Sequence, residues 1–228
     1  MLLVEPDVFH APAVEDAVDH DRPPLDVGLP TPDRFRSHRF CGGRAGLGQL
    51  LGPAAGRGGA WGSVRRNPRG RELPIARAIT VTDTGRAHPL LASRPAVFDA
   101  LCSHLDEIET LPPNSQVLAA NEVSAVQAIA AQTSGRGSFH GTQYHPEHTF
   151  AVSAALVEMR AAELVDEGLG ASLSEIVAIA VDYRALDAEP TRRDLIWRYG
   201  IAREIMDPVR RTAEIGNWLR TVVAPRRV

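Results

Sequence analysis

The sequence contains no lysine, and all 25 of its basic residues are arginine. Because arginine codons are mostly GC-rich and lysine codons are AT-rich, this absence indicates a GC-rich gene. The 28 acidic residues bring the formal net charge to −3. Such a balance gives no electrostatic footprint for nucleic acid or for an anionic membrane. We therefore expect neither as a partner.

Long hydrophobic runs and cysteines are also scarce. No stretch approaches about 18 consecutive apolar residues, which excludes a transmembrane helix. The first seven residues carry acids and a proline where a signal peptide needs a basic start and an apolar run. Two cysteines, Cys41 and Cys102, make no disulfide framework and are typical of a reducing compartment. We therefore expect a cytoplasmic protein.

The 228 residues divide into two unlike parts. In residues 1–64, six prolines interrupt the first 40 positions, and nine of the chain's 19 glycines lie between Cys41 and Gly62. Apolar residues there follow neither period two nor period 3.6, so an irregular segment is predicted. Residues 65–228 have the texture of a folded domain, and the chain's 44% hydrophobic content is enough for a core.

Within the second part, short apolar runs predict strands and longer periodic runs predict helices. Strands are expected at 78–82, ending in a turn at 83–85, and at 116–120, 125–129 and 138–144. Val152, Ala155, Leu156 and Met159 form an apolar stripe at helical spacing. The last helix is expected to have Asp207 as N-cap and Pro208 in its first turn, with Ile215, Trp218, Leu219 and Val222 on one face.

The strongest short signal is the run from Gly141 to Glu147, Gly-Thr-Gln-Tyr-His-Pro-Glu. It places His145 at the end of a strand, with a carboxylate two residues later. Histidine is the natural general base near neutral pH, and a nearby carboxylate can orient its ring. A surface turn with a capping glutamate is the simpler interpretation of an isolated His-Pro-Glu. A metal site is a further alternative, because His140 and His148 lie close in sequence.

This run resembles the His/Glu motif of the class I (triad) glutamine amidotransferases. Other segments follow in the family's order, and they resemble its stand-alone members related to the amidotransferase domain of GMP synthase. The resemblance covers roughly residues 65–225. The matching segments are Asn67–Glu72, His88–Leu91, Ser103–Glu107, Leu111–Pro112, Val117–Ala119, and the tract from Tyr183 through Trp197 to Leu219.

The resemblance implies a three-layer, flavodoxin-like α/β fold with a mostly parallel sheet. Members of the family attack the side-chain amide of glutamine with a cysteine thiolate, release ammonia and hydrolyse the thioester to glutamate. His145 would be the general base and Glu147 its orienter. Glutamine is then the expected small-molecule partner, together with an ammonia acceptor that the sequence does not identify. No cofactor or metal is implied.

The family's nucleophile is missing from its expected place. That cysteine sits in Gly-x-Cys-x-Gly-x-Gln at a strand-to-helix elbow, and the family spacing places it at position 50. This chain has Leu50 there. Cys41 lies nine residues too early and lacks the glutamine four residues later, and Cys102 is better explained as a small core thiol. We therefore expect the chain as written to be inactive and its fold to be incomplete at the N-terminus.

A shift in reading frame would explain the missing thiol. In a GC-rich gene the pair Leu50-Leu51 is readily encoded by two CTG codons, and these read as Cys-Trp one nucleotide later. Across Gly48–Ala54 the shifted frame permits Gly-Ser-Cys-Trp-Gly-Leu-Gln. Residues 1–64 would then be out of frame. The alternative is a divergent relative that kept the glutamine site and lost the thiol, as a binding or regulatory module.

Overall fold

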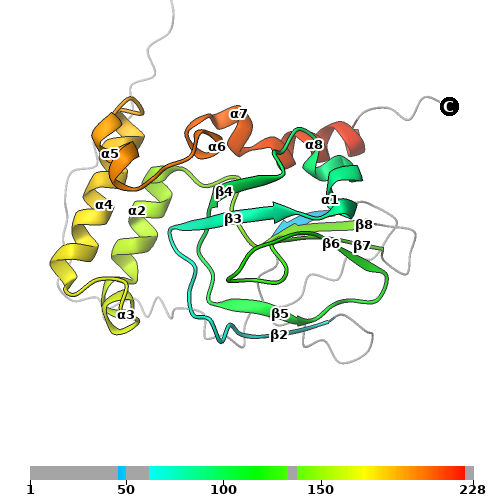
Figure 1. Cartoon of the computed structure of the whole chain (residues 1–228), viewed down its shortest axis with the longest axis horizontal. Helices are drawn as coiled ribbons and strands as arrows, with labels where there is room; N and C mark the ends of the chain where they lie inside the picture. Colours follow the sequence, from blue (N-terminus) through cyan, green and yellow to red (C-terminus); the bar gives the residue numbers. More distant parts are fainter. Residues whose placement is uncertain (1–45, 50–61, 133–137, 224–228) are drawn as a thin grey trace, which may run out of the picture. The chain divides into compact units, whose positions relative to one another are not determined.

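The computed structural model describes residues 46–49, 62–132 and 138–223 (Figure 1). All of them belong to one compact unit, Phe35–Val228. Cys41 and Leu50 lie outside the described residues, as do most of residues 1–64. None of the described helices is long and apolar enough to cross a membrane.

Within the described residues, six strands form the main sheet, in the order β1-β8-β7-β6-β3-β4. Among the strands that the structure describes, only β1 and β8 pair in parallel, and the other four pairings of this sheet are antiparallel. The strands are β1 (Gly46–Gln49), β3 (Ile75–Val81), β4 (Val97–Leu101), β6 (Ser115–Ala120), β7 (Ala128–Gln132) and β8 (Ser138–Thr142).

Helices and strands together confirm the predicted α/β class, but the expected mostly parallel sheet is wrong for the described strands. The physical reason is connectivity. Strands β6, β7 and β8 follow one another closely in sequence, whereas a parallel pair needs a crossover of a dozen or more residues. The parallel pair β1–β8 does join segments that are far apart in the chain.

The strand predictions largely hold. Those for 78–82, 116–120 and 138–144 overlap β3, β6 and β8, whereas β7 begins three residues later than the predicted start at 125. The delay arises because Asn121 holds a loop, its Oδ1 accepting a hydrogen bond from the Ser124 N–H at 2.8 Å. A second, two-stranded antiparallel sheet pairs β2 (Ser63–Arg66) with β5 (Asp106–Thr110).

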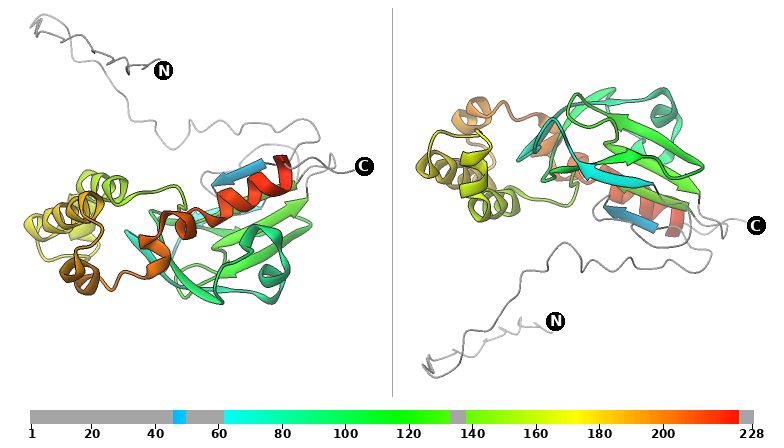
Figure 2. Two further views of the ribbon diagram at one scale, coloured as in Figure 1. Left: turned by 90° about the horizontal axis from the view of Figure 1, so that it is seen from above. Right: turned by 90° about the horizontal axis from the view of Figure 1, so that it is seen from below.

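The turn expected at 83–85 is instead the start of a short helix, α1 (Asp83–Ala87), capped by Thr82. Gly85 is required there, because a Cβ at this position would lie 2.0 Å from the Leu118 carbonyl oxygen. A 3-10 turn, η2 (Pro89–Leu91), follows α1, and the last described helix, α8 (Ala213–Val223), packs against it. Helix α8 is the red helix in Figure 2.

The remaining helices follow β8 in sequence. They are α2 (Phe150–Met159), α3 (Ala161–Asp166), α4 (Leu173–Ala188), α5 (Arg193–Arg198), α6 (Arg203–Met206), α7 (Pro208–Arg211) and α8 (Ala213–Val223). Helices α2 and α4 pack directly on each other (Figure 1). Their core includes Leu164, Ile176 and Leu186, and it also takes in Ile75 and Leu101 from the ends of β3 and β4.

The predicted buried faces of two helices need correction. In α2 the buried residues are Phe150, Ser153, Ala154 and Val157, whereas Val152 and Met159 of the expected stripe are 41% and 65% exposed. In α8 the most buried residues are polar, Glu214 and Asn217, and Leu219 is exposed. The expected cap is confirmed only in part: Asp207 accepts from the Val209 N–H with Pro208 in the first turn, but the helix that it caps is the short α7, and the last helix, α8, begins separately at Ala213.

Candidate active site

His145 and Glu147 lie just beyond the end of β8, joined by a hydrogen bond. The distance from His145 Nδ1 to Glu147 Oε1 is 2.7 Å. The His145 side chain is 8% exposed, and that of Glu147 is 54% exposed. The His145 backbone N–H donates to the Leu101 carbonyl at 2.8 Å, which fixes the backbone position from which the imidazole side chain extends. A carboxylate on Nδ1 favours the tautomer in which Nε2 carries the lone pair, as a general base requires.

The Glu147 carboxyl is held in its charged form. Burial raises the pKa of Glu147, but its hydrogen bond with His145, a backbone hydrogen bond and nearby imidazoles outweigh burial, so that the net pKa is lowered. His148 completes the cluster, with its ring stacked on that of His145 at 3.7 Å between centroids and 12° between planes. Burial, followed by the charge of His145, lowers the pKa of His148 to about 4. His148 is therefore neutral near pH 7.

The parallel pair β1–β8 brings the end of β1 and the histidine motif to one edge of the sheet. Gly48 of β1 is opposite Gly141 of β8, and Gln49 is opposite Thr142. Position 50 follows the last residue of β1, and His145 lies three residues after the last residue of β8. Parallel strands end at the same edge. The strand ends therefore suit a nucleophile on β1 and a base after β8, although Leu50 itself lies outside the described residues.

The residue before His145 is anchored to the C-terminal helix. The Tyr144 hydroxyl donates to Glu214 Oε1 at 2.6 Å. Arg94 also donates to that carboxylate, through Nε and Nη2, both at 2.6 Å. The Arg94 and Glu214 side chains are 2% and 0% exposed, so this is a buried ion pair. It ties α8 to the strand end that carries the site.

A second buried network centres on Glu72. Its Oε2 lies 2.8 Å from His104 Nε2 and accepts from Gln127 Nε2 at 2.7 Å, and its Oε1 accepts from Asn121 Nδ2 at 2.6 Å. The Cys102 thiol donates to the Glu72 backbone carbonyl at 3.1 Å. The family-like segments that contain Glu72 and His104 therefore meet in space.

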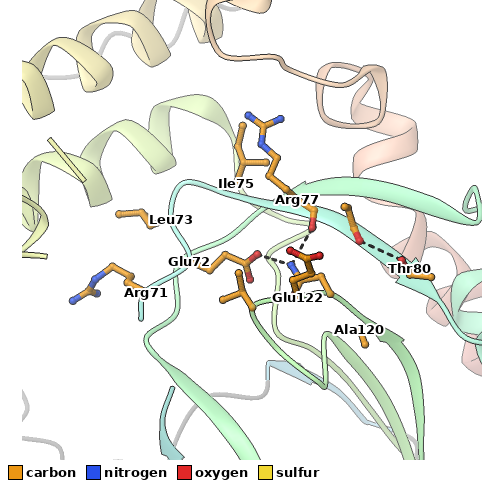
Figure 3. Close-up of a pocket in the computed structure, with 11 residues that line it drawn as sticks. Arg71, Glu72, Leu73, Ile75, Arg77, Thr80, Ala120 and Glu122 are labelled. Atoms are coloured by element: carbon orange, nitrogen blue, oxygen red, sulfur yellow. Dashed lines mark hydrogen bonds between the residues drawn. The ribbon is translucent and has the colours of Figure 1, made fainter. Parts of the chain in front are cut away.

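An open pocket of about 630 Å³ lies beside this network (Figure 3). Its lining includes Glu72, Arg77 and Glu122, but neither His145 nor Glu147. Arg77 is already committed, because it donates to Asp99 at 2.9 Å and to the Gly200 carbonyl at 2.6 Å. The pocket is therefore not the place where the histidine motif acts.

The metal alternative does not fit the geometry. His145, Glu147 and His148 bring three potential ligand atoms close together, but the two imidazole planes are stacked. Imidazole lone pairs lie in the ring plane, so nearly parallel rings cannot both aim at one ion about 2.0–2.1 Å away. His140 is not part of this cluster, and its ring contacts His88 instead, with centroids 5.2 Å apart.

The prediction that Cys102 is a thiol of the core is confirmed. It is 0% exposed, and burial, followed by the charge of Glu72, raises its pKa well above the usual range. A thiol held in its protonated form is neither a nucleophile nor a good metal ligand. The group Glu72, Cys102 and His104 is accordingly an internal hydrogen-bonded network.

Comparisons with known proteins now place the chain. The family model described as "Glutamine amidotransferase class-I" matches residues 48–160. Over this region the chain belongs to the class I glutamine amidotransferases. The match begins at residue 48, within the segment that we expected to be unlike the family.

Two known proteins and one solved structure are similar to the chain. A gamma-glutamyl-L-1-hydroxyisopropylamide hydrolase from a Pseudomonas species is 31% identical over 156 residues, covering 68% of this chain and 52% of that protein. The glutamine-hydrolysing GMP synthase of Thermomicrobium roseum is 42% identical over 81 residues, 34% of this chain and 14% of that protein. A solved glutamine amidotransferase from Thermotoga maritima has a TM-score of 0.42 and 16% identity, covering 71% of this chain and 55% of the other. The chain spans about half or less of the length of these proteins.

Sequence reasoning selected His145 and Glu147 but missed the residues that support them. Glu72 stood within a family-like segment without an assigned role, and Glu214 carried no signal, since a lone glutamate in a helix is normally solvated. His148 was visible only as a possible metal ligand. A buried polar role depends on partners far away in sequence, and no local pattern shows those partners.

Proposed function

We propose that the reaction of this site is hydrolysis of the glutamine side-chain amide, with His145 as general base and Glu147 as its orienter. The observation that carries the proposal is the 2.7 Å contact from His145 Nδ1 to Glu147 Oε1 at the end of β8. Since β8 runs parallel to β1, position 50 follows the neighbouring strand end. The family uses glutamine in this way and passes ammonia to an acceptor.

In the same proposal, the chain as written does not turn over glutamine. Position 50 is Leu50, and no cysteine occurs between Gly48 and Gly62. Without a thiolate no thioester forms, so a general base has nothing to activate. The low cysteine content supports a cytoplasmic location as part of this proposal.

We attribute the missing thiol to a frame change, with residues 1–64 out of frame and 65–228 as the amidotransferase-like domain. The leucine pair and the glycine-rich composition support this division. A second candidate is a thiol-less glutamine-binding module. It is favoured by β1 and by the family match, which reach back into the first segment as far as residues 46 and 48.

The deciding experiment resequences the coding DNA from upstream of Met1 through Asn67 and translates all three frames. An open frame carrying Gly-x-Cys-x-Gly-x-Gln supports the frame change. If no frame carries that motif, the frame change is excluded. The full chain is then assayed for glutamate release and, by calorimetry, for glutamine binding. Saturable binding without turnover supports the module, whereas turnover by the chain as written contradicts the proposed inactivity.

The substrate class follows from the relatives' names. The Pseudomonas protein is named for hydrolysis of an N-substituted γ-glutamyl amide, and glutamine is the unsubstituted γ-glutamyl amide. We therefore include an N-alkyl γ-glutamyl amide beside glutamine in the binding assay. Tighter binding of the substituted amide would redirect the proposal from ammonia supply to γ-glutamyl amide cleavage.

A further inference from the structure

A second imidazole covers the face of the candidate base. The rings of His145 and His148 are 3.7 Å apart at their centroids and 12° from parallel. A tight turn creates the stack, because the His148 N–H donates to the His145 carbonyl at 3.2 Å. Both side chains are nearly buried, at 8% and 11% exposed. The stack therefore leaves the His145 ring little freedom to rotate out of its plane.

The polar atoms of His148 do not explain why it is there. Its Nδ1 is buried without a hydrogen-bond partner among the described residues. Its Nε2 lies 3.9 Å from Glu147 Oε1, which is too long for a hydrogen bond. Burial of an unpaired ring nitrogen is unfavourable. What His148 does contribute is a flat face against His145.

We propose that His148 is a positioning residue: its stacked ring fixes the plane of the His145 imidazole and thereby keeps His145 Nδ1 on the Glu147 carboxylate. That this orientation serves catalysis rests on the proposed function, whereas the orientation of the His145 ring by His148 does not. The helix that follows supports the arrangement, since α2 begins directly after it and Thr149 caps it, with Oγ1 accepting from the Val152 N–H.

The test reads the tautomer of His145 by nitrogen-15 NMR on the full chain at pH 8. His148→Phe keeps a flat aromatic face, and His148→Leu removes it at similar size. His88→Asn is the control, because it removes an imidazole outside the cluster of His145, Glu147 and His148, while an asparagine can still accept from the Leu90 N–H, as His88 does. If the leucine chain does not fold, His148→Gln takes its place.

We expect the wild-type, H148F and H88N chains to show one predominant His145 tautomer, protonated at Nδ1. In H148L the two nitrogen signals of His145 should move toward each other, as the tautomers mix. A wild-type pattern in H148L would overturn the proposal, and so would equal disturbance in H148F and H148L. Because the readout needs no turnover, the result does not depend on the proposed reaction, and glutamine hydrolysis by the chain as written would count against the proposed function alone.

Discussion

Glu214 has no exposed surface, yet its carboxylate is held by donors from two side chains. Arg94 binds it through two nitrogens, and the Tyr144 hydroxyl adds a third hydrogen bond. Two buried charges are costly to desolvate, and only close, well-formed hydrogen bonds offset that cost. The Arg94 guanidinium also lies 4.6 Å from the centre of the Phe98 ring. The position of Tyr144, the residue before His145, thus depends on an ion pair in which neither partner can be removed without leaving a buried charge.

Replacing one member of this pair should destabilise the fold strongly. We expect Arg94→Leu to lower the free energy of unfolding by about 3–5 kcal/mol, because Glu214 is left as an uncompensated buried charge. Urea denaturation measures the loss. Arg192→Leu is the matched control, since its partner Asp194 is 60% exposed and solvent screens such a pair, so that its loss should change stability little. Equal losses in the two variants would refute the argument.

The stability of the chain should depend on pH through His148. Its pKa is lowered to about 4 by burial and then by the His145 charge, against an ordinary value of 6.5. Between these values the unfolded state binds more protons, so stability is fully present above about pH 6.5 and is lost as the pH falls toward 4. Burial also lowers the pKa values of His88 and His140, which adds in the same direction.

Urea midpoints at pH 7 and pH 5 measure this dependence. We expect a lower midpoint at pH 5, and a smaller difference between the two pH values in His148→Phe, which cannot take up the proton. The lowered pKa of Glu147 acts the same way at still lower pH, because a depressed carboxyl loses its stabilisation on protonation. A midpoint that is unchanged or higher at pH 5 would show that the His148 ring is not shielded from water.

The residues of the candidate site were only partly predictable from sequence. His145 and Glu147 could be selected because they are two residues apart and belong to one local motif. Glu72 and Glu214 could not, because their partners are separated from them by as many as 55 and 120 positions. A glutamate is held in the core by such partners rather than by its neighbours in sequence, so a prediction from hydrophobic periodicity places it on the surface.

At the level of elements, α4 shows most clearly which contacts hold the helices together. Leu186 of α4 is 0% exposed in the core shared with α2, whereas Leu173 at the start of the same helix is 55% exposed. Both are leucines in one helix, so the same substitution separates burial from helix propensity.

We expect Leu186→Ala to lower the free energy of unfolding by about 2–5 kcal/mol, from lost burial and the cavity left behind. Leu173→Ala should change it by about 0.5 kcal/mol or less, as for most exposed sites. Thermal or urea denaturation of the two variants provides the measurement. Similar effects at both positions would mean that α4 is not packed as described.

The existence of the helices could be predicted, but their inward faces could not. In α2 the sequence offers apolar residues on more than one side, and the buried side includes Ser153 together with the small Ala154. Small residues are selected there because α2 and α4 pack closely, a property of the pair rather than of either helix. Similarly, Asn217 is drawn inward because its side chain donates to the Leu90 and Ala92 carbonyls, both at 2.8 Å.

For the molecule as a whole, the question is whether its scaffold still accepts a nucleophile. The supports around His145 are complete in the part of the chain that the structure describes: a carboxylate on Nδ1, a stacked ring, and a buried ion pair behind Tyr144. Such a preorganised shell is what keeps a catalytic group in position. What the sequence lacks is a thiol after β1.

Restoring that thiol is therefore the most informative change. The variant combining Gln49→Ser, Leu50→Cys, Leu51→Trp, Pro53→Leu and Ala54→Gln recreates the family heptapeptide between Gly48 and Ala54. We expect it to release glutamate from glutamine, whereas the parent chain does not. Adding His145→Gln should then lower kcat by roughly 10²–10⁴, the usual contribution of a general base.

Coupled measurement of glutamate release, with a thiol-directed glutamine analogue as a second readout, distinguishes the outcomes. Turnover that depends on His145 would show that the nucleophile after β1 and the base after β8 act in one active site at the same edge of the sheet, as the parallel pairing of the two strands indicates. Labelling without turnover would mean that the thiol is accessible but that the backbone after position 50 does not form the donors needed for a tetrahedral intermediate. If His145→Gln leaves turnover unchanged, His145 is not the general base, even though its geometry suits that role.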